Sequence, residues 1–412
     1  MVKSHKASKI LEAASSPKLN THDAEGNVAL YVHLPYCVKK CRYCDFNSYA
    51  YTDQNIDAYL AAVLQEARLR ATDLKPHTLF VGGGTPTLVE ADKLKVFLDE
   101  LNQITGFADT VVEATIEANP ESFDDATAHA VFASGINRLS LGFQSLRNDV
   151  LLAYDRVHDA DQSFRAFESA RNAGFDNINI DLIYSFPGQL LEEWLADLES
   201  IHALSPEHLS CYELSYEPGT SLTKLRDAGR HHPNTNEFAK EIFEQTRGAN
   251  RAAGYHAYEV SAFSKTDREC KHNLAYWNSS QYIGLGAGAA SWINPDRIMN
   301  IASPEKYIAA ITAQQNFHQD KNLCSPSTIL FDVLMMGLRL ENKGVSLDRV
   351  TALSGLDARQ HYSEKWGAFV SDGLIDFYNE NGQDFVRATE KGYLHLDTIL
   401  AELLPDDDVL TV

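Results

Sequence analysis

Short apolar runs alternate with longer amphipathic stretches as far as Gly254. The short runs are rich in Val, Ile, Leu, Phe and Thr and have turn residues nearby, which is typical of strands. These strands are predicted at 29–33, 78–81, 111–118, 138–141, 177–183 and 209–214. Helical periodicity predicts helices at 55–71, 91–103, 124–133, 162–173 and 190–203. Repeated strand–helix units indicate a parallel sheet, either doubly wound or closed toward a barrel.

The pattern changes beyond Gly254. A Gly-Ala segment, 284–290, either packs tightly or leaves space beside it. Ser325-Pro326-Ser327 resembles a boundary, and helical periodicity at 330–340, 346–354 and 359–371 is followed by a hairpin at 374–378 and 385–388. Three helices and a hairpin predict a winged-helix-like α+β domain. We expect a polar N-terminal extension at 1–27, a barrel at 28–254, a connecting region at 255–324 and the winged-helix-like domain at 325–412.

Charge narrows the possible partners. The 412 residues include 57 acidic and 36 basic side chains, a formal net charge of −21. Such a balance argues against a nucleic-acid binder and against electrostatic docking on anionic lipid. The acidic tail Asp406–Asp408 makes DNA binding by the last domain less plausible still. No run of 18 apolar residues predicts a membrane span, and residues 1–27 lack the apolar core of a signal peptide, so we expect a cytoplasmic protein without stable membrane insertion.

The cysteines carry the first chemical signal. Cys37, Cys41 and Cys44 follow the first predicted strand with the spacing C-x3-C-x2-C, whereas the other three are scattered. Three thiolates on one short loop can hold three irons of a [4Fe–4S] cluster and leave the fourth iron open to a ligand. The alternative is a zinc site with His33 or a distant cysteine as fourth ligand. The absence of a second C-x-x-C pair favours the cluster.

A second signal follows the second predicted strand. The run Gly82-Gly83-Gly84-Thr85-Pro86-Thr87 would expose backbone groups to a ligand, although a plain turn has the same composition. It lacks the G-K-[ST] ending of a P-loop.

These two elements, in this order at successive strand ends, resemble the radical S-adenosylmethionine (SAM) superfamily. That family uses C-x3-C-x2-C for its cluster and a Gly-rich strand end for the amino group of SAM. The resemblance implies an incomplete (β/α)6 radical SAM barrel. Further motifs are similar to the oxygen-independent coproporphyrinogen oxidase group: Glu117-Ala118-Asn119-Pro120, Gly142-Phe143-Gln144-Ser145, Arg156-Val157-His158 and Asp181-Leu182-Ile183.

Two branches of that group differ at positions that this sequence contains. The oxidase has a fourth cysteine where this chain has Phe46. The HemW branch of heme chaperones has phenylalanine there and an H-N-x-x-Y-W motif, which matches residues 272–277 here. Both features place the chain with the HemW branch.

The resemblance implies a set of SAM contacts. Glu117 and Asp181 would accept hydrogen bonds from ammonium or ribose hydroxyls, and Arg156 would pair with the methionine carboxylate. Most of these residues stand at predicted carboxyl ends of strands, where barrel enzymes build their sites. The full set is Tyr31, Tyr43, Gly83, Gly84, Thr85, Glu117, Gln144, Arg156 and Asp181.

His272 is the candidate heme ligand, since imidazole commonly ligates heme iron. Tyr276 and Trp277 would line the porphyrin face, and the Gly-Ala segment would leave room for it. Cys270 is an alternative ligand, and a His-Asn pair that caps a loop over an aromatic core is the structural alternative.

The implied function is delivery of heme to acceptor heme proteins, with a [4Fe–4S] cluster, SAM, heme and an electron donor. Three other functions stay open: oxidative decarboxylation of coproporphyrinogen III, radical chemistry on another substrate, and a zinc-stabilised binding module. Because Phe46 and the H-N-x-x-Y-W motif depart from the oxidase, we expect no coproporphyrinogen oxidase activity.

Overall fold

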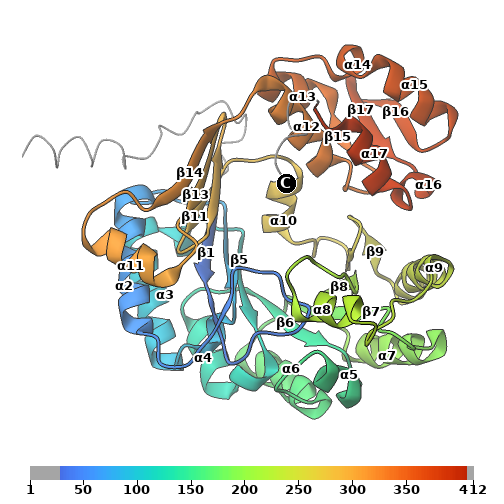
Figure 1. Ribbon diagram of the computed structural model, residues 1–412. Coiled ribbons are helices and arrows are strands. Elements are labelled where there is room, and N and C mark those ends of the chain that lie inside the picture. Colours follow the sequence, from blue (N-terminus) through green and yellow to red (C-terminus); the bar gives the residue numbers. More distant parts are fainter. Residues whose placement is uncertain (1–27, 406–412) are drawn as a thin grey trace, which may run out of the picture.

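The computed structural model describes residues 28–405 (Figure 1). The N-terminal extension expected at 1–27 and the acidic tail at 406–408 lie outside the described residues. Within them, one twelve-stranded sheet has the order β14-β13-β12-β11-β1-β4-β5-β6-β7-β8-β10-β9. No helix of this part of the chain is long and apolar enough to cross a membrane.

Neighbouring parallel strands form the centre of the sheet. They are β1 (Ala29–Leu34), β4 (Thr78–Gly83), β5 (Glu113–Ala118), β6 (Arg138–Gln144), β7 (Ile178–Tyr184) and β8 (His208–Glu213). The helices between them are α2 (Ile56–Arg70), α3 (Ala91–Thr105), α4 (Asp125–Ala133), α6 (Ala160–Ala173) and α7 (Leu191–Leu204), with α9 (Asn236–Ala252) after β8. Figure 1 shows these helices around the outside of a curved sheet that does not close. The predicted incomplete (β/α)6 barrel is therefore confirmed.

Local sequence explains where the helices begin and end. At the start of α6, the Asp159 side chain accepts a hydrogen bond from the Gln162 N–H, and the Gln162 side chain accepts one from the Asp159 N–H, which forms a capping box. The helix buries Ala166 and Phe167 against the sheet and ends at Gly174, whose φ of 108° suits glycine. The helix predicted at 162–173 is therefore confirmed, and in the structure it begins two residues earlier.

The region between the barrel and the last domain extends both edges of the sheet. At one edge β11 (Tyr282–Leu285) pairs in parallel with β1, and β12 (Ala290–Ile293), β13 (Asp296–Asn300) and β14 (His318–Leu323) follow antiparallel. At the other edge β10 (Ala262–Ser264) pairs with β8 and β9 (His256–Ala257) follows. Helices α10 (Lys271–Trp277) and α11 (Pro304–Thr312) interrupt these strands.

The Gly-Ala segment packs tightly. A Cβ at Gly284 would lie 2.1 Å from the Ala290 carbonyl oxygen, and one at Gly286 would lie 2.5 Å from the His33 carbonyl oxygen. Even a methyl side chain is excluded at these two glycines, because backbone atoms already fill the space. The expectation that this segment leaves room for a macrocycle was wrong.

The C-terminal part has its own apolar core and three-stranded sheet, in the order β15-β17-β16. Its elements are α12 (Pro326–Gly337), β15 (Val345–Ser346), α13 (Leu347–Ser354), α14 (Ala358–His361), α15 (Ser363–Ser371), β16 (Ile375–Glu380), β17 (Gln383–Ala388), α16 (Glu390–Tyr393) and α17 (Leu396–Leu403). Helices followed by a β-hairpin confirm the winged-helix-like prediction. The helix expected at 359–371 is instead two helices that meet at Tyr362, whose hydroxyl donates to the Leu403 carbonyl.

Candidate functional site

One cavity of about 540 Å³ runs through the inside of the barrel. Successive side chains of a β-strand point to opposite faces, so alternate residues of each strand line the cavity. The lining includes Tyr31 of β1, Phe80 of β4, Glu117 of β5, Ser140 of β6, Asp181 of β7 and Ser210 of β8. A cavity of this volume is large enough for a cofactor-sized ligand.

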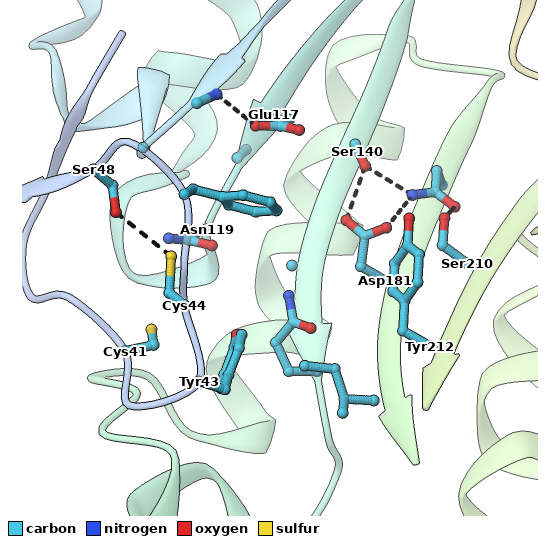
Figure 2. Close-up of a pocket in the computed structure, with 18 of the residues that line it drawn as sticks. Cys41, Tyr43, Cys44, Ser48, Glu117, Asn119, Ser140, Asp181, Ser210 and Tyr212 are labelled. Carbon is cyan, nitrogen blue, oxygen red and sulfur yellow. Dashed lines mark hydrogen bonds between the residues drawn. The ribbon is translucent and has the colours of Figure 1, made fainter. Parts of the chain in front are cut away.

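The cysteine loop forms one wall of the cavity. After β1 the chain turns at Pro35 into the short strand β2 (Tyr36–Cys37), and the thiols of Cys37, Cys41 and Cys44 all belong to the cavity lining. Figure 2 shows Cys41 and Cys44 on this loop and Asp181 on the opposite wall. The structure thus brings the three predicted cluster ligands together on one wall of the cavity.

The thiols have different surroundings. Cys44 Sγ lies 3.5 Å from Ser48 Oγ, and Cys41 Sγ lies 3.6 Å from a guanidinium nitrogen of Arg156. Burial raises the pKa of the Cys37 thiol to about 11, against a hydrogen bond with Thr85 that lowers it. A bound metal would deprotonate such a thiol.

The surroundings of the thiols and of His33 bear on the zinc alternative. Among residues 28–405, no three His, Cys, Asp or Glu side chains converge closely enough to hold a single metal ion. Zinc requires its thiolates within about 2.3 Å, whereas the irons of a cluster are separated from one another. His33, the suggested fourth zinc ligand, is 6% exposed, and its nitrogens lie 2.9 Å from Tyr31 Oη and the Asn47 carbonyl oxygen.

The glycine run joins β4 to the cysteine loop. The Gly84 and Thr85 N–H groups donate to the Leu34 and Tyr36 carbonyls, and the Gly83 N–H donates to Glu117 Oε2 at 3.0 Å. These bonds fix the loop and the carboxylate relative to one another.

Glycine is required here because protein atoms are close. Gly83 has a φ of +112°, and a Cβ there would lie 2.4 Å from the His33 ring. At Gly84 a Cβ would lie 2.6 Å from the Pro35 carbonyl carbon, within the start of the cysteine loop. A side chain at either position would therefore displace protein atoms before it met any ligand. A Gly84→Val variant would therefore disturb the cysteine loop together with any ligand site.

Two carboxyl groups line the cavity, one from Glu117 of β5 and one from Asp181 of β7. Burial raises the pKa of Glu117 to about 7, while the Gly83 N–H lowers it and the charge of Asp181 raises it. Burial also raises the pKa of Asp181, although Asn179 and Ser140 donate to it at 2.8 and 3.0 Å. A cationic ligand between these groups would relieve both effects.

Arg156 supplies the opposite charge. One of its nitrogens donates to the Gly142 carbonyl at 2.9 Å, and its Nε is buried with no hydrogen-bond partner among the described residues. Nearby Tyr43 and Cys41 raise the pKa of Arg156 against its burial, which lowers it, so the group stays charged. Arg156 therefore adds a cationic group to a cavity that is also lined by two carboxyl groups, a combination that fits a zwitterionic ligand.

Thr85 alone among the predicted contacts lies outside the cavity lining. It is 2% exposed, and its hydroxyl accepts a hydrogen bond from Asn119 Nδ2 at 2.8 Å. Thr85 therefore positions Asn119 and Cys37 through hydrogen bonds from outside the cavity. Cavity-lining residues that the motifs did not single out include inward positions of the same strands: Phe80, Ser140, Asn179, Ser210 and Tyr212. Their period-two spacing was the available signal.

Helix α10 closes the opposite end of the cavity. Glu113, the first residue of β5, accepts from the Lys271 and His272 N–H groups and from the Cys270 thiol. The amino ends of the parallel strands lie here, whereas the cysteine loop follows the carboxyl end of β1. The H-N-x-x-Y-W motif and the cysteines thus contact the same cavity from opposite ends.

Both nitrogens of His272 are hydrogen-bonded. Nδ1 lies 2.9 Å from Thr78 Oγ1 and Nε2 lies 2.9 Å from Tyr276 Oη, and the side chain is 1% exposed. Burial lowers the pKa of His272 to about 3, so the imidazole is neutral. Tyr276 lines the cavity as expected, but Trp277 does not: its ring lies under Arg339 of the C-terminal part, 5.5 Å away.

Comparisons with known proteins agree with this geometry. The family model of the radical SAM superfamily matches residues 31–201, and that of the HemN C-terminal domain matches residues 324–395. The chain is 34% identical to the heme chaperone HemW of Bacillus subtilis, over 89% of this chain and 92% of that protein. It is 38% identical to the heme chaperone HemW of Haemophilus influenzae, over 64% of this chain and 69% of that protein.

The fold is similar to a solved structure. Coproporphyrinogen III oxidase (HemN) from Escherichia coli, described as a radical SAM enzyme, superimposes with a TM-score of 0.77. The match covers 95% of this chain and 92% of that one at 23% identity, which bears on the fold alone.

Proposed function

The chain belongs to the HemW family of radical SAM proteins, and on this premise we propose that it is a heme chaperone. It would bind heme and transfer it to acceptor heme proteins. The resemblance inferred from the cysteine, glycine and H-N-x-x-Y-W motifs is confirmed at the level of the family. Membership of the radical SAM superfamily carries a [4Fe–4S] cluster and SAM.

Cys37, Cys41 and Cys44 would hold the cluster, supported by their shared position on one cavity wall. Once bound, the cluster and SAM would supply one-electron chemistry at this wall of the cavity. The protein's part is to place the ligand. Glu117 and Asp181 would hold the ammonium or ribose hydroxyls, and the guanidinium of Arg156 would pair with the carboxylate.

The remaining predicted contacts complete the pocket. Tyr31, Tyr43, Gly83, Gly84 and Gln144 all line the cavity, and Thr85 supports it. Tyr31, Tyr43 and Phe80 also line the cavity, and their rings would help to exclude water from a ligand bound between the cysteine loop and the carboxylates. Exclusion of water strengthens the charged contacts that orient the ligand.

One observation carries the heme proposal: His272 and Tyr276 of the family motif contact the same cavity as the cysteines. His272 remains our proposed ligand because neutral imidazole offers a lone pair to iron. Its Nε2 must first lose the contact with Tyr276 Oη. The hydroxyl of Tyr276 is therefore a competitor of the iron for this nitrogen.

This competition predicts that substitutions of His272 and of Tyr276 have different effects on heme affinity. His272→Gln should lower heme affinity by about tenfold or more, because the amide lacks a strong iron ligand. Tyr276→Phe should leave heme affinity unchanged or raise it, since Nε2 is then free. Heme titration of the reconstituted protein, with and without SAM, measures both through the Soret band.

The matched control is His129→Gln, an exposed histidine on α4. Iron content and thermal unfolding show that each variant is folded. A His272→Gln variant with wild-type heme affinity and spectrum would remove His272 as the ligand. Loss of heme in Tyr276→Phe alone would assign the ligand to the phenol, and Cys270→Ala tests a thiolate in the same way.

A decarboxylation assay tests the alternative activity. Phe46 stands where the oxidase branch has a fourth cysteine, and its side chain is 65% exposed at the cavity. We expect no protoporphyrinogen IX under anaerobic, reduced conditions with SAM present. Its accumulation would replace the chaperone proposal with the oxidase.

A further inference from the structure

The Gly-Ala segment, residues 284–290, lies outside the cavity lining but contacts the cysteine loop. The Asn47 side chain of that loop donates to the Ala287 carbonyl at 3.0 Å and to the Ala302 carbonyl at 3.1 Å. Both amide hydrogens of Asn47 are therefore used. Its Oδ1 accepts a hydrogen bond from the Tyr49 hydroxyl at 3.0 Å. Carbonyls that are 240 and 255 positions away in the sequence thus hold the end of the loop.

A buried polar network holds the Gly-Ala segment in place. Glu66 of α2 is fully buried and accepts hydrogen bonds from the Gly286 N–H at 2.9 Å and from Arg70 at 2.6 Å. The Tyr59 hydroxyl, also from α2, accepts one from the Ala287 N–H at 2.8 Å. Buried pairs of this kind are costly to displace, because displacement leaves a charge or a donor without a partner. The Ala287 carbonyl is therefore a fixed acceptor for the loop.

Gly288 brings the backbone of the segment close to Asn47. It has a φ of +75°, and a Cβ there would lie 2.3 Å from Asn47 Nδ2 and 3.0 Å from Asn47 Cγ. These distances are shorter than a contact between non-bonded atoms, so a side chain at Gly288 would push the Asn47 amide away from its two carbonyl acceptors. The contact with the loop therefore requires this glycine, as does its own backbone conformation.

The Asn47 contacts lead directly to one of the cysteines. Ser48, the next residue, is buried, and its Oγ lies 3.5 Å from Cys44 Sγ (Figure 2). When Cys44 is a thiolate, the hydroxyl donates this hydrogen bond, because the sulfur carries no proton. Hydrogen bonds to the ligating sulfurs help to set the reduction potential of an iron–sulfur cluster. The position of Asn47 therefore bears on both the place of Cys44 and its hydrogen bond.

We propose that the Gly-Ala segment is a positioning element of the cysteine site, which acts through Asn47 on Ser48 and Cys44. The inference rests on the proposed function, since it takes Cys44 as a cluster ligand. Without the Asn47 contacts, the loop after Cys44 is held by fewer hydrogen bonds, and the thiolate leaves its iron more often. The Ser48 hydrogen bond is then formed less often, so the cluster is harder to reduce, because a donor to sulfur stabilises the more negative, reduced state.

Gly288→Ala tests the proposal from the side of the segment, without a change in the loop itself. We expect an iron chelator to remove iron from the reconstituted protein about tenfold faster, the size that the loss of two hydrogen bonds gives. The midpoint potential of the cluster, measured by redox titration, should become more negative. The matched control is Gly355→Ala, because Gly355 has the same φ of +75° but no protein atom within 4 Å of an added Cβ among the described residues.

Asn47→Asp tests the same contact from the side of the loop. It keeps the size of the side chain and an acceptor for Tyr49, but turns a carboxylate oxygen toward the two carbonyls that the amide now reaches. It should reproduce the faster iron loss and the more negative potential of Gly288→Ala. Asn322→Asp, the same change on the exposed strand β14, should behave as the wild-type protein.

Alkylation of the iron-free protein separates this inference from the proposed function. Iodoacetamide should modify Cys44 about tenfold faster in Gly288→Ala and Asn47→Asp than in the wild-type protein or the controls, as located by mass spectrometry. Wild-type rates of iron loss and alkylation in both variants would overturn the proposal, as would an equal change in Gly355→Ala. A reconstituted wild-type protein without a cluster would instead contradict the proposed function, and alkylation would still decide whether the segment positions Cys44.

Discussion

Replacement of Cys37, Cys41 or Cys44 by alanine is expected to abolish the iron–sulfur cluster, which is the largest effect that we predict. Each thiol stands on one loop that lines the cavity, and three thiolates are the fewest that hold a cubane with an open iron. Loss of one leaves an iron without a ligand. Iron and sulfide analysis after anaerobic reconstitution, with the visible absorption of the cluster, measures the loss.

The remaining cysteines provide matched controls. Cys211 is 2% exposed and lies 3.8 Å from Asn250 Nδ2, outside the cavity lining. Cys270 donates to Glu113 at the opposite end of the barrel from the loop. Alanine at either position should leave iron content at the wild-type level. Equal loss of iron in Cys211→Ala or Cys270→Ala would contradict the assignment of three ligands and an open iron.

The site at the carboxyl ends of the strands could be predicted from sequence because its signals are local. Cys37 follows β1, Gly83 ends β4 and Gln144 ends β6, so strand prediction alone brings them to one edge. The structure places all of them on the cavity, although their roles as ligands stay predictions. Proposed domain limits at 254/255 and 324/325 also stay predictions.

The place of α10 could not be predicted. Its hydrogen bonds to Glu113 join residues 158 and 159 positions apart, and no local pattern encodes such a contact. The outer strands were missed for a related reason. β14 has the sequence HQDKNL and is mostly exposed, so it lacks the apolar signal of a buried strand. Charged edge strands are common because they limit edge-to-edge association.

The second large effect is expected at Glu117. Glu117→Gln keeps the size of the side chain and an acceptor for the Gly83 N–H, but removes the negative charge. A hydrogen bond to a charged group contributes about 1.5–3 kcal/mol. SAM affinity should therefore fall by about tenfold to about a hundredfold, with iron content unchanged. Isothermal titration calorimetry with SAM and the reconstituted protein measures this affinity.

The pH dependence gives a sharper test than affinity alone. The pKa of Glu117 is raised to about 7, so the free protein carries a neutral carboxyl below that pH and a carboxylate above it. The cationic ligand prefers the carboxylate. SAM affinity should then rise with pH through 7 and level off above it, with a slope approaching about tenfold per unit below. In Glu117→Gln this rise should disappear.

Glu259 supplies the matched control for this titration. Burial raises its pKa to about 7 as well, but Glu259 lies outside the cavity lining and accepts from the Ser261 N–H. A general effect of pH on the fold would be altered equally by Glu259→Gln. The rise in affinity should persist in Glu259→Gln and vanish in Glu117→Gln. The reverse result would assign the pH dependence to Glu259 and remove Glu117 from the SAM site.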